Sequence, residues 1–236
     1  MKKIVIAAIA TGMGLLTQPV LADGVGINAL RLIFPEKSNS ITTSVRNTTK
    51  NTDYLTQVKI TASVDGGAAP FVAIPPMFRL AANSENQIRI IKTGGDLPSD
   101  RESLFWFTMQ SVPASSDSAS SAEKINGIVQ VGLGSTIKFI YRPDGLSESP
   151  EKGFCMLKFR HSPDGMTLTN LSPYYVSFSS FKADGKELMS DAQPVKMIAP
   201  LSDEIMLTKG LRAQAKIDWQ AITDLGGTVN CSGMLQ

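Results

Sequence analysis

The sequence predicts an all-β protein built from two β-sandwich domains in tandem. Three observations support this class. Short runs rich in Val, Ile, Thr and aromatic residues recur with turn residues between them, no stretch has the 3.6-residue period of an amphipathic helix, and the chain has 236 residues. That length suits two domains of roughly a hundred residues each, or one large β domain. The spacing of the runs favours antiparallel sandwiches over alternating strands and helices.

The first 22 residues have the three parts of a secretory signal. Two lysines supply the positive charge, the apolar run over residues 4–16 is too short to span a bilayer, and Val20–Ala22 is a small-residue cleavage site. We expect residues 1–22 to be removed and the mature chain to begin at Asp23. An uncleaved anchor is the alternative. No later apolar run reaches the roughly 20 residues needed to cross a membrane.

Composition excludes several classes of function. Without the signal the formal charge falls from +2 to 0, so nothing points to nucleic acid. No CxxC, HExxH, GxSxG or P-loop spacing occurs, and the single histidine, His161, stands in a turn-like HSPDG segment. We therefore expect no enzyme activity, no metal and no cofactor.

Six strand-like runs define a first domain over residues 23–143. They are Ala29–Phe34, Ile41–Arg46, Tyr54–Ser63, Gln87–Lys92, Leu104–Val112 and Ile128–Tyr141. Residues 144–150, rich in Pro, Gly and charge, read as a linker. Six more runs define a second domain over residues 151–236. They are Cys155–Arg160, Met166–Asn170, Tyr174–Phe181, Val195–Ile198, Glu204–Thr208 and Lys216–Ile222.

The last run of the first domain stands out. Val129, Val131 and Leu133 alternate with small or polar residues, which predicts a strand with one apolar face. A serine-rich run over residues 113–124 precedes it, so its first half is expected to emerge from a solvated loop. An apolar strand face at such a place promotes aggregation unless a partner covers it. The run is thus a candidate for strand addition to another protein. The alternative is that these side chains fill the protein's own core.

The only cysteines, Cys155 and Cys231, both fall in the second domain. An exported protein meets an oxidising compartment, so we expect a disulfide that cross-links this domain. Two free buried thiols are the alternative.

Seven motifs, in order along essentially the whole mature chain, resemble the PapD-like periplasmic pilus chaperones of the chaperone–usher pathway. They are ALRLIFP (29–35), IPPMFRLAANSENQIRI (74–90), LPSDRESLFWF (97–107), IKFIYRP (137–143), NLSPYYVSFSS (170–180), MIAPLS (197–202) and AITDLGG (221–227). The resemblance implies two immunoglobulin-like sandwiches set at an angle with a cleft between them, located in the periplasm.

The resemblance also implies a function. Such a chaperone binds exported fimbrial subunits one-to-one, completes their unfinished sandwich with its own edge strand, and delivers them to an outer-membrane usher. It is a monomer when free or weakly self-associating, and neither nucleic acid nor membrane insertion is expected. The residues that match the family's donor strand are Ile125, Val129, Val131 and Leu133, with one gap at Gly127.

Two further groups of residues match functional positions of the family. Arg31 and Lys138 match the basic pair that holds the terminal carboxylate of the subunit. Glu102, Arg142 and Asp224 match a buried charge cluster that sets the angle between the domains. Taken without the resemblance, Arg31 and Lys138 read as solvated surface charges, and Glu102 and Asp224 as ordinary surface carboxylates.

One departure concerns the segment that leads to Lys138, which is longer than in the commonest pilus chaperones and resembles a long-loop subgroup. Members of that subgroup usually tie the flanking strands with a disulfide, whereas Thr108 and Thr136 stand at the matching positions here. A cross-strand threonine pair substitutes weakly for such a bridge.

Two other classes of function are open. One is an exported fibre subunit or adhesin, against which stands the short, glycine-rich mature start, Asp23–Ile27, with no apolar donor segment. The other is an exported carbohydrate- or peptide-binding module.

Overall fold

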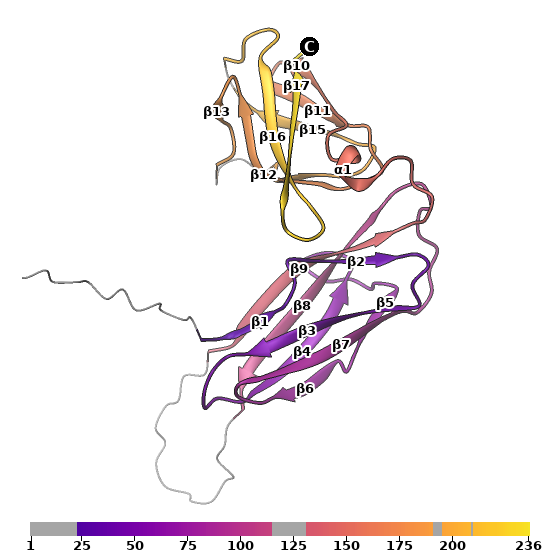
Figure 1. Ribbon diagram of the computed structural model, residues 1–236, viewed down its shortest axis with the longest axis vertical. Coiled ribbons are helices and arrows are strands. Elements are labelled where there is room, and N and C mark those ends of the chain that lie inside the picture. The colour runs from indigo at the N-terminus through magenta and orange to yellow at the C-terminus, as the bar shows by residue number, and fades with distance from the viewer. Residues whose placement is uncertain (1–22, 115–130, 191–194, 209) are drawn as a thin grey trace, which may run out of the picture.

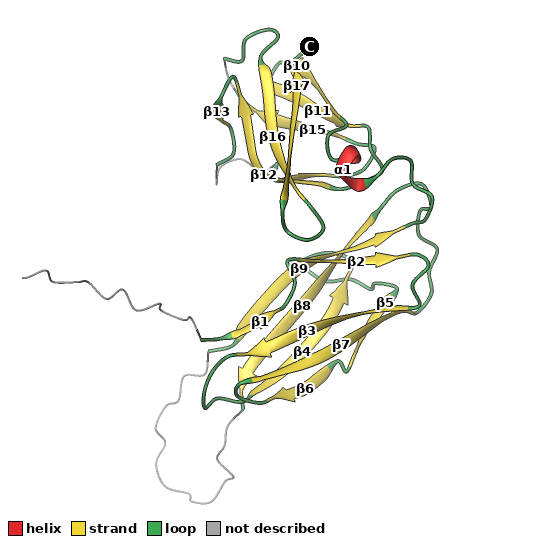
Figure 2. Cartoon of the chain, in the orientation of Figure 1, coloured by secondary structure: helices red, strands yellow, loops and turns green. Residues whose placement is uncertain are grey.

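The computed structural model describes residues 23–114, 131–190, 195–208 and 210–236. In these ranges 17 strands and one short helix form two β-sandwich domains, which Figure 1 shows one above the other. The all-β, two-domain class predicted from the sequence is confirmed. Figure 2 shows how little of the chain is helical.

The first domain packs a four-stranded sheet on a five-stranded sheet. The four-stranded sheet has the order β1 (Val25–Ile27), β3 (Ser40–Asn47), β7 (Ser84–Lys92), β5 (Phe71–Ile74). The five-stranded sheet has the order β2 (Arg31–Pro35), β9 (Leu133–Arg142), β8 (Ser103–Pro113), β4 (Tyr54–Thr61), β6 (Met77–Leu80). Neighbouring strands are antiparallel except β2 and β9, which run parallel.

An aromatic cluster forms the core between these sheets. Phe34, Phe71 and Phe139 come from three strands, and their ring centroids lie 4.7–6.1 Å apart. Successive side chains of a strand point to opposite faces. Because Phe34 and Phe139 face the core, Arg31 on β2 and Lys138 on β9 face the opposite side of the five-stranded sheet.

The one-turn helix α1 (Pro150–Gly153) leads from the linker into the second domain. One sheet has the order β10 (Leu157–Ser162), β11 (Gly165–Asn170), β15 (Asp203–Leu207). The other has the order β13 (Lys186–Glu187), β12 (Val176–Ala183), β16 (Lys216–Ile222), β17 (Thr228–Met234), and β14 (Met197–Ile198) pairs with β12.

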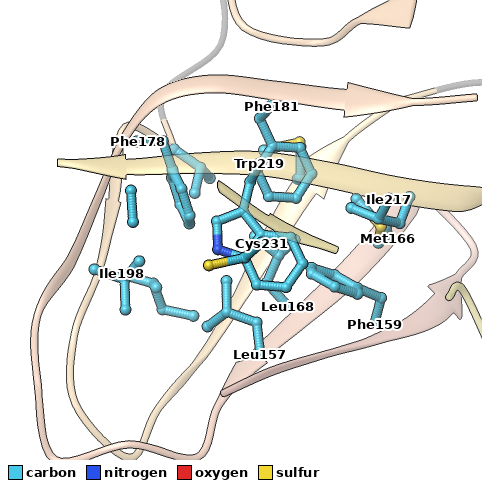
Figure 3. Close-up of a cluster of buried hydrophobic side chains, with 14 of the residues drawn as sticks. Leu157, Phe159, Met166, Leu168, Phe178, Phe181, Ile198, Ile217, Trp219 and Cys231 are labelled. Atoms are coloured by element: carbon cyan, nitrogen blue, oxygen red, sulfur yellow. The ribbon is translucent and has the colours of Figure 1, made fainter. Parts of the chain in front are cut away.

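Trp219 lies in the middle of the second core, as Figure 3 shows. Its ring centroid lies 5.2 Å from that of Phe159, and its indole N–H donates a 3.0 Å hydrogen bond to the carbonyl of Phe154. Cys155 and Cys231 form a disulfide that joins the segment after α1 to β17, whose Cys231 stands opposite Trp219.

The structure corrects the expected strand Ile128–Tyr141, because β9 begins at Leu133 and the described Val131 and Gly132 precede it. The physical reason lies in β8. The register between β8 and β9 ends at Ser111 opposite Leu133. Its continuation would bring Pro113 opposite Val131, and proline has no N–H to donate to the ladder.

The helix α1 is a single turn, too short to have an amphipathic 3.6-residue period in the sequence. Proline suits the first position of α1, and Gly153 suits its end because a Cβ there would lie 2.4 Å from the Tyr174 ring. The strands β1, β5, β6, β13 and β17 were not expected from the sequence. β17 illustrates the reason: it buries only Cys231, so it has no alternating apolar pattern.

The disulfide should stabilise the second domain alone. Replacing Cys155 and Cys231 by Ala is expected to lower its free energy of unfolding by about 4 kcal/mol, because the unfolded chain regains the freedom of a long loop. Urea unfolding followed by Trp219 fluorescence, in a Trp106→Phe background, measures this loss. Equal unfolding midpoints with and without the cysteines would contradict the prediction.

Candidate functional site: two cations at the domain junction

The parallel pairing of β2 and β9 places Arg31 directly beside Lys138. Both side chains leave the sheet on the face turned away from the first core. Arg31 is only 8% exposed. Lys138 donates a 2.7 Å hydrogen bond from Nζ to Oγ of Ser177, which lies on β12 of the second domain. The two cations therefore lie where the domains meet.

Burial makes this cation pair energetically costly. It lowers the pKa of Lys138 from its ordinary 10.5 to about 8, and the neighbouring Arg31 charge adds to that effect. Burial also lowers the pKa of Arg31, although the nearby carboxylates of Asp224 and Glu102 act in the opposite direction. In the described part of the chain no carboxylate forms a salt bridge with either cation. Such a pair attracts an anion that brings its own hydrogen-bond acceptors.

A second group of charges joins the domains next to the cation pair. Arg142, at the end of β9, donates from Nε to Oε1 of Glu102 at 2.7 Å and from Nη1 and Nη2 to both oxygens of Asp224 at 2.6 and 3.0 Å. Glu102 lies in the first domain and Asp224 in the loop between β16 and β17. The structure thus brings together the three residues singled out in the sequence.

Glu102 makes two more contacts across the junction. Its Oε2 accepts a 2.8 Å hydrogen bond from the backbone N–H of Tyr175, and its own N–H donates to the carbonyl of Pro173 at 2.9 Å. Burial raises the pKa of Glu102, an effect that Arg142 and the Tyr175 N–H oppose. The Arg142 guanidinium also lies 5.3 Å from the centre of the Tyr174 ring. A buried carboxylate with this many partners fixes geometry.

β9 has a free edge just before the cation pair. β8 pairs with it from Leu133 to Tyr141, whereas β2 pairs only from Lys138 to Arg142. Over residues 133–137 the second edge has no paired strand within the described ranges. Such an edge exposes backbone donors and acceptors and is a template for another chain.

The apolar face of β9 continues beyond the first core. Leu133 lies on the same side of the strand as Ile137 and Phe139, which belong to the core or pack against it. Leu133 is 37% exposed and Val131 is 66% exposed. Ile125 and Val129, the other two residues expected in the donor strand, lie outside the described residues.

The sequence did not single out Ser177, the partner of Lys138. It stands within the motif NLSPYYVSFSS, where serines at several positions conceal the one that faces the junction. Thr108 and Thr136 do lie opposite each other on β8 and β9, with their hydroxyl oxygens 3.1 Å apart. This hydrogen bond joins the side chains of the two strands.

Other classes of site find no support in the described ranges. No group of three or more His, Cys, Asp or Glu side chains there could hold a metal ion. Among the residues described, no helix has the length and apolar character needed to cross a membrane. His161 is exposed on β10, in the second domain and away from the cation pair.

Comparison with known proteins identifies the family and the fold. Residues 24–147 match the family described as pili and flagellar-assembly chaperone, PapD N-terminal domain, and residues 155–232 match the PapD C-terminal domain of pili assembly chaperones. The chain is 36% identical over 226 residues to the probable fimbrial chaperone YadV of Escherichia coli, covering 89% of each chain. It is 32% identical over 210 residues to the chaperone HifB of Haemophilus influenzae, covering 85% of this chain and 83% of HifB.

Solved structures of chaperones are also similar to this chain. The YadV crystal structure has a TM-score of 0.73 at 34% identity, and the alignment covers 89% of this chain and 99% of YadV. A chain in the Salmonella enterica complex of the SafA pilin with the SafB chaperone has a TM-score of 0.77 at 28% identity, covering 91% of this chain and 98% of that chain.

Two β-sandwiches joined through partly buried ion pairs, with paired cations at the junction and a partly free apolar edge strand, fit the protein-binding chaperones that this chain resembles, which are not enzymes. The chain belongs to the PapD family of pilus assembly chaperones.

The charge on Lys138 should make stability depend on pH in a defined window. The unfolded lysine keeps its proton up to about pH 10.5 and the folded one only up to about 8, so between these values the unfolded state binds more protons. The free energy of unfolding of the wild type should therefore rise relative to that of Lys138→Met as the pH increases from 8 to 10.5. Denaturant unfolding at several pH values measures this, with Lys59→Met on β4 as the exposed control. A constant difference would refute the prediction.

Removing the bridging guanidinium should leave an uncompensated buried carboxylate. Arg142→Ala is expected to lower the free energy of unfolding by about 3 kcal/mol at pH 7. The loss should shrink at pH 5, because an unpaired Glu102 takes up a proton more readily. Arg212→Ala, which removes an exposed ion pair with Asp184, is the matched control and should have a small effect. Similar losses for the two variants would argue against the role of Arg142.

Proposed function

We propose that this protein is a periplasmic chaperone that completes exported fimbrial subunits with its own strand β9 and delivers them to an outer-membrane usher. In this proposal residues 1–22 are removed on export, residues 23–143 carry the donor strand, residues 144–150 link the domains, and residues 151–236 form the second domain. The free chaperone is a monomer or self-associates weakly.

The observation that carries the proposal is the position of the cation pair at the end of the free edge of β9. A subunit strand laid along residues 133–137 gains ladder hydrogen bonds from this edge. Its terminal carboxylate then reaches Arg31 and Lys138, whose charges no carboxylate of the described chain neutralises through a salt bridge.

The anchor also sets the register of pairing. Side chains alternate along a strand, so a slip of one residue would turn every apolar side chain of β9 away from the groove that it fills. A fixed carboxylate at Lys138 prevents that slip. Val131 and Leu133, together with Ile125 and Val129, then occupy successive pockets of the subunit. Burying three or four such side chains contributes roughly 5–10 kcal/mol before the costs of association.

The solved complex of the related SafB chaperone with the SafA pilin supports a pilin subunit as the partner. The cluster of Glu102, Arg142 and Asp224 supports the geometry, because it ties β9 to the second domain. We assign the cluster the task of setting the angle between the domains, so that Ser177 and Lys138 meet beside Arg31.

The test is co-expression with a fimbrial subunit encoded beside the chaperone, followed by recovery of the one-to-one complex through a tag on the chaperone. Arg31→Ala and Lys138→Ala should each reduce recovery at least tenfold, because the subunit loses its charged anchor. Lys59→Ala on the same sheet is the control and should behave as wild type. Circular dichroism checks that each variant is folded.

Two outcomes would reject the proposal. One is equal recovery of the subunit with and without the cations. The other is self-polymerisation of the purified chain, which would favour a fibre subunit.

A further inference from the structure

The loop between β16 and β17 extends from the second domain toward the first, as Figure 1 shows. Hydrogen bonds within the loop and hydrogen bonds from the first domain hold its conformation. Within the loop, the Thr223 N–H donates to the Gly227 carbonyl at 2.8 Å and the Gly226 N–H donates to the Thr223 carbonyl at 3.0 Å. From outside, the two Arg142 hydrogen bonds hold Asp224. The residue after Asp224 therefore has a fixed position.

That residue is Leu225, and its side chain is 99% exposed. A second exposed leucine reaches the same loop from the first domain. Leu30 is 72% exposed and packs on the backbone of Gly226, where a Cβ would lie 2.6 Å from Leu30 Cδ1. Gly226 also has a φ of +84°, so glycine is required there on two grounds. The structure thus brings two exposed leucines, one from each domain, to one loop.

Single exposed leucines are common and need no explanation. This pair differs because of its neighbours. Leu30 directly precedes the anchor residue Arg31, and Leu225 directly follows Asp224, whose charge acts on Arg31. Leu30 is therefore next to one cation along the chain, and Leu225 is next to a carboxylate whose charge acts on that same cation.

We propose that Leu30 and Leu225 bind apolar side chains in the last residues of the fimbrial subunit, next to the carboxylate that Arg31 and Lys138 hold. This inference rests on the proposed function and deepens it. The cations recognise only that a chain ends, a feature common to every protein. The leucines add selectivity for ends that are apolar as well as charged, and they make the second domain part of the binding site.

The decisive variant is Leu225→Ser, because a fully exposed side chain contributes little to the fold. Met234→Ser, at the far end of β17 and 51% exposed, is the matched control. The probe is the purified complex with the fimbrial subunit encoded beside the chaperone, and the measurement is the rate at which excess wild-type chaperone displaces each variant. Leu225→Ser should release the subunit about tenfold faster, whereas Met234→Ser should match the wild type.

A second measurement identifies the contact on the subunit. Each apolar residue among the last five of the subunit is replaced by Ser, and release is measured with wild-type chaperone and with Leu225→Ser. A residue that contacts Leu225 should give losses that do not add when both changes are combined. Additive losses at every position would overturn the inference.

The outcomes also separate this inference from the proposed function. If Lys138→Ala loses the subunit while Leu225→Ser retains it with unchanged release, the anchor stands and the leucine contact fails. If Lys138→Ala also retains it, the proposed function itself fails. If Leu225→Ser changes only the self-association of the free chaperone in sedimentation, the occupant is a second copy of this chain and the inference is overturned.

Discussion

The bidentate contact between Arg142 and Asp224 is the interaction on which the rest of the site depends. Arg142 ends the strand that presents the free edge, and Asp224 begins the turn that carries Leu225. Through Glu102 the same guanidinium also reaches the segment that holds Ser177 beside Lys138. In the proposed function, this one side chain couples the orientation of the second domain to the position of both cations. Without it, two folded sandwiches would be expected to remain, but not the composite site.

The cations at this junction oppose stability, and in the proposed function they serve binding. Two positive side chains held side by side and partly desolvated disfavour the folded state, as the lowered pKa of Lys138 shows. A bound carboxylate would relieve that repulsion. Binding therefore recovers free energy that the fold has given up, which is a common relation between a functional site and the structure around it.

Sequence patterns predicted the strands whose alternation is strong, and they failed where a strand is short or has little to bury. β4 shows clear alternation, whereas β17 buries a single cysteine among Gly, Ser and Asn. The charged residues of the junction were found only through the resemblance to pilus chaperones, because an arginine on a strand looks the same whether it faces water or another domain. Ser177 was missed for the same reason. Its partner, Lys138, is distant in sequence, and the contact depends on how the two domains are placed relative to each other.

The parallel strand β2 limits how far another polypeptide strand could extend along the edge of β9. It occupies the second edge of β9 from Lys138 onward, so a strand growing along the vacant stretch meets the backbone of β2 at Arg31 and has nowhere to continue. An internal segment of a polypeptide would have to bend sharply away at this barrier, whereas a chain terminus simply stops. In the proposed function, the topology of this sheet therefore favours the end of a polypeptide over an internal segment by shape alone, apart from any effect of charge.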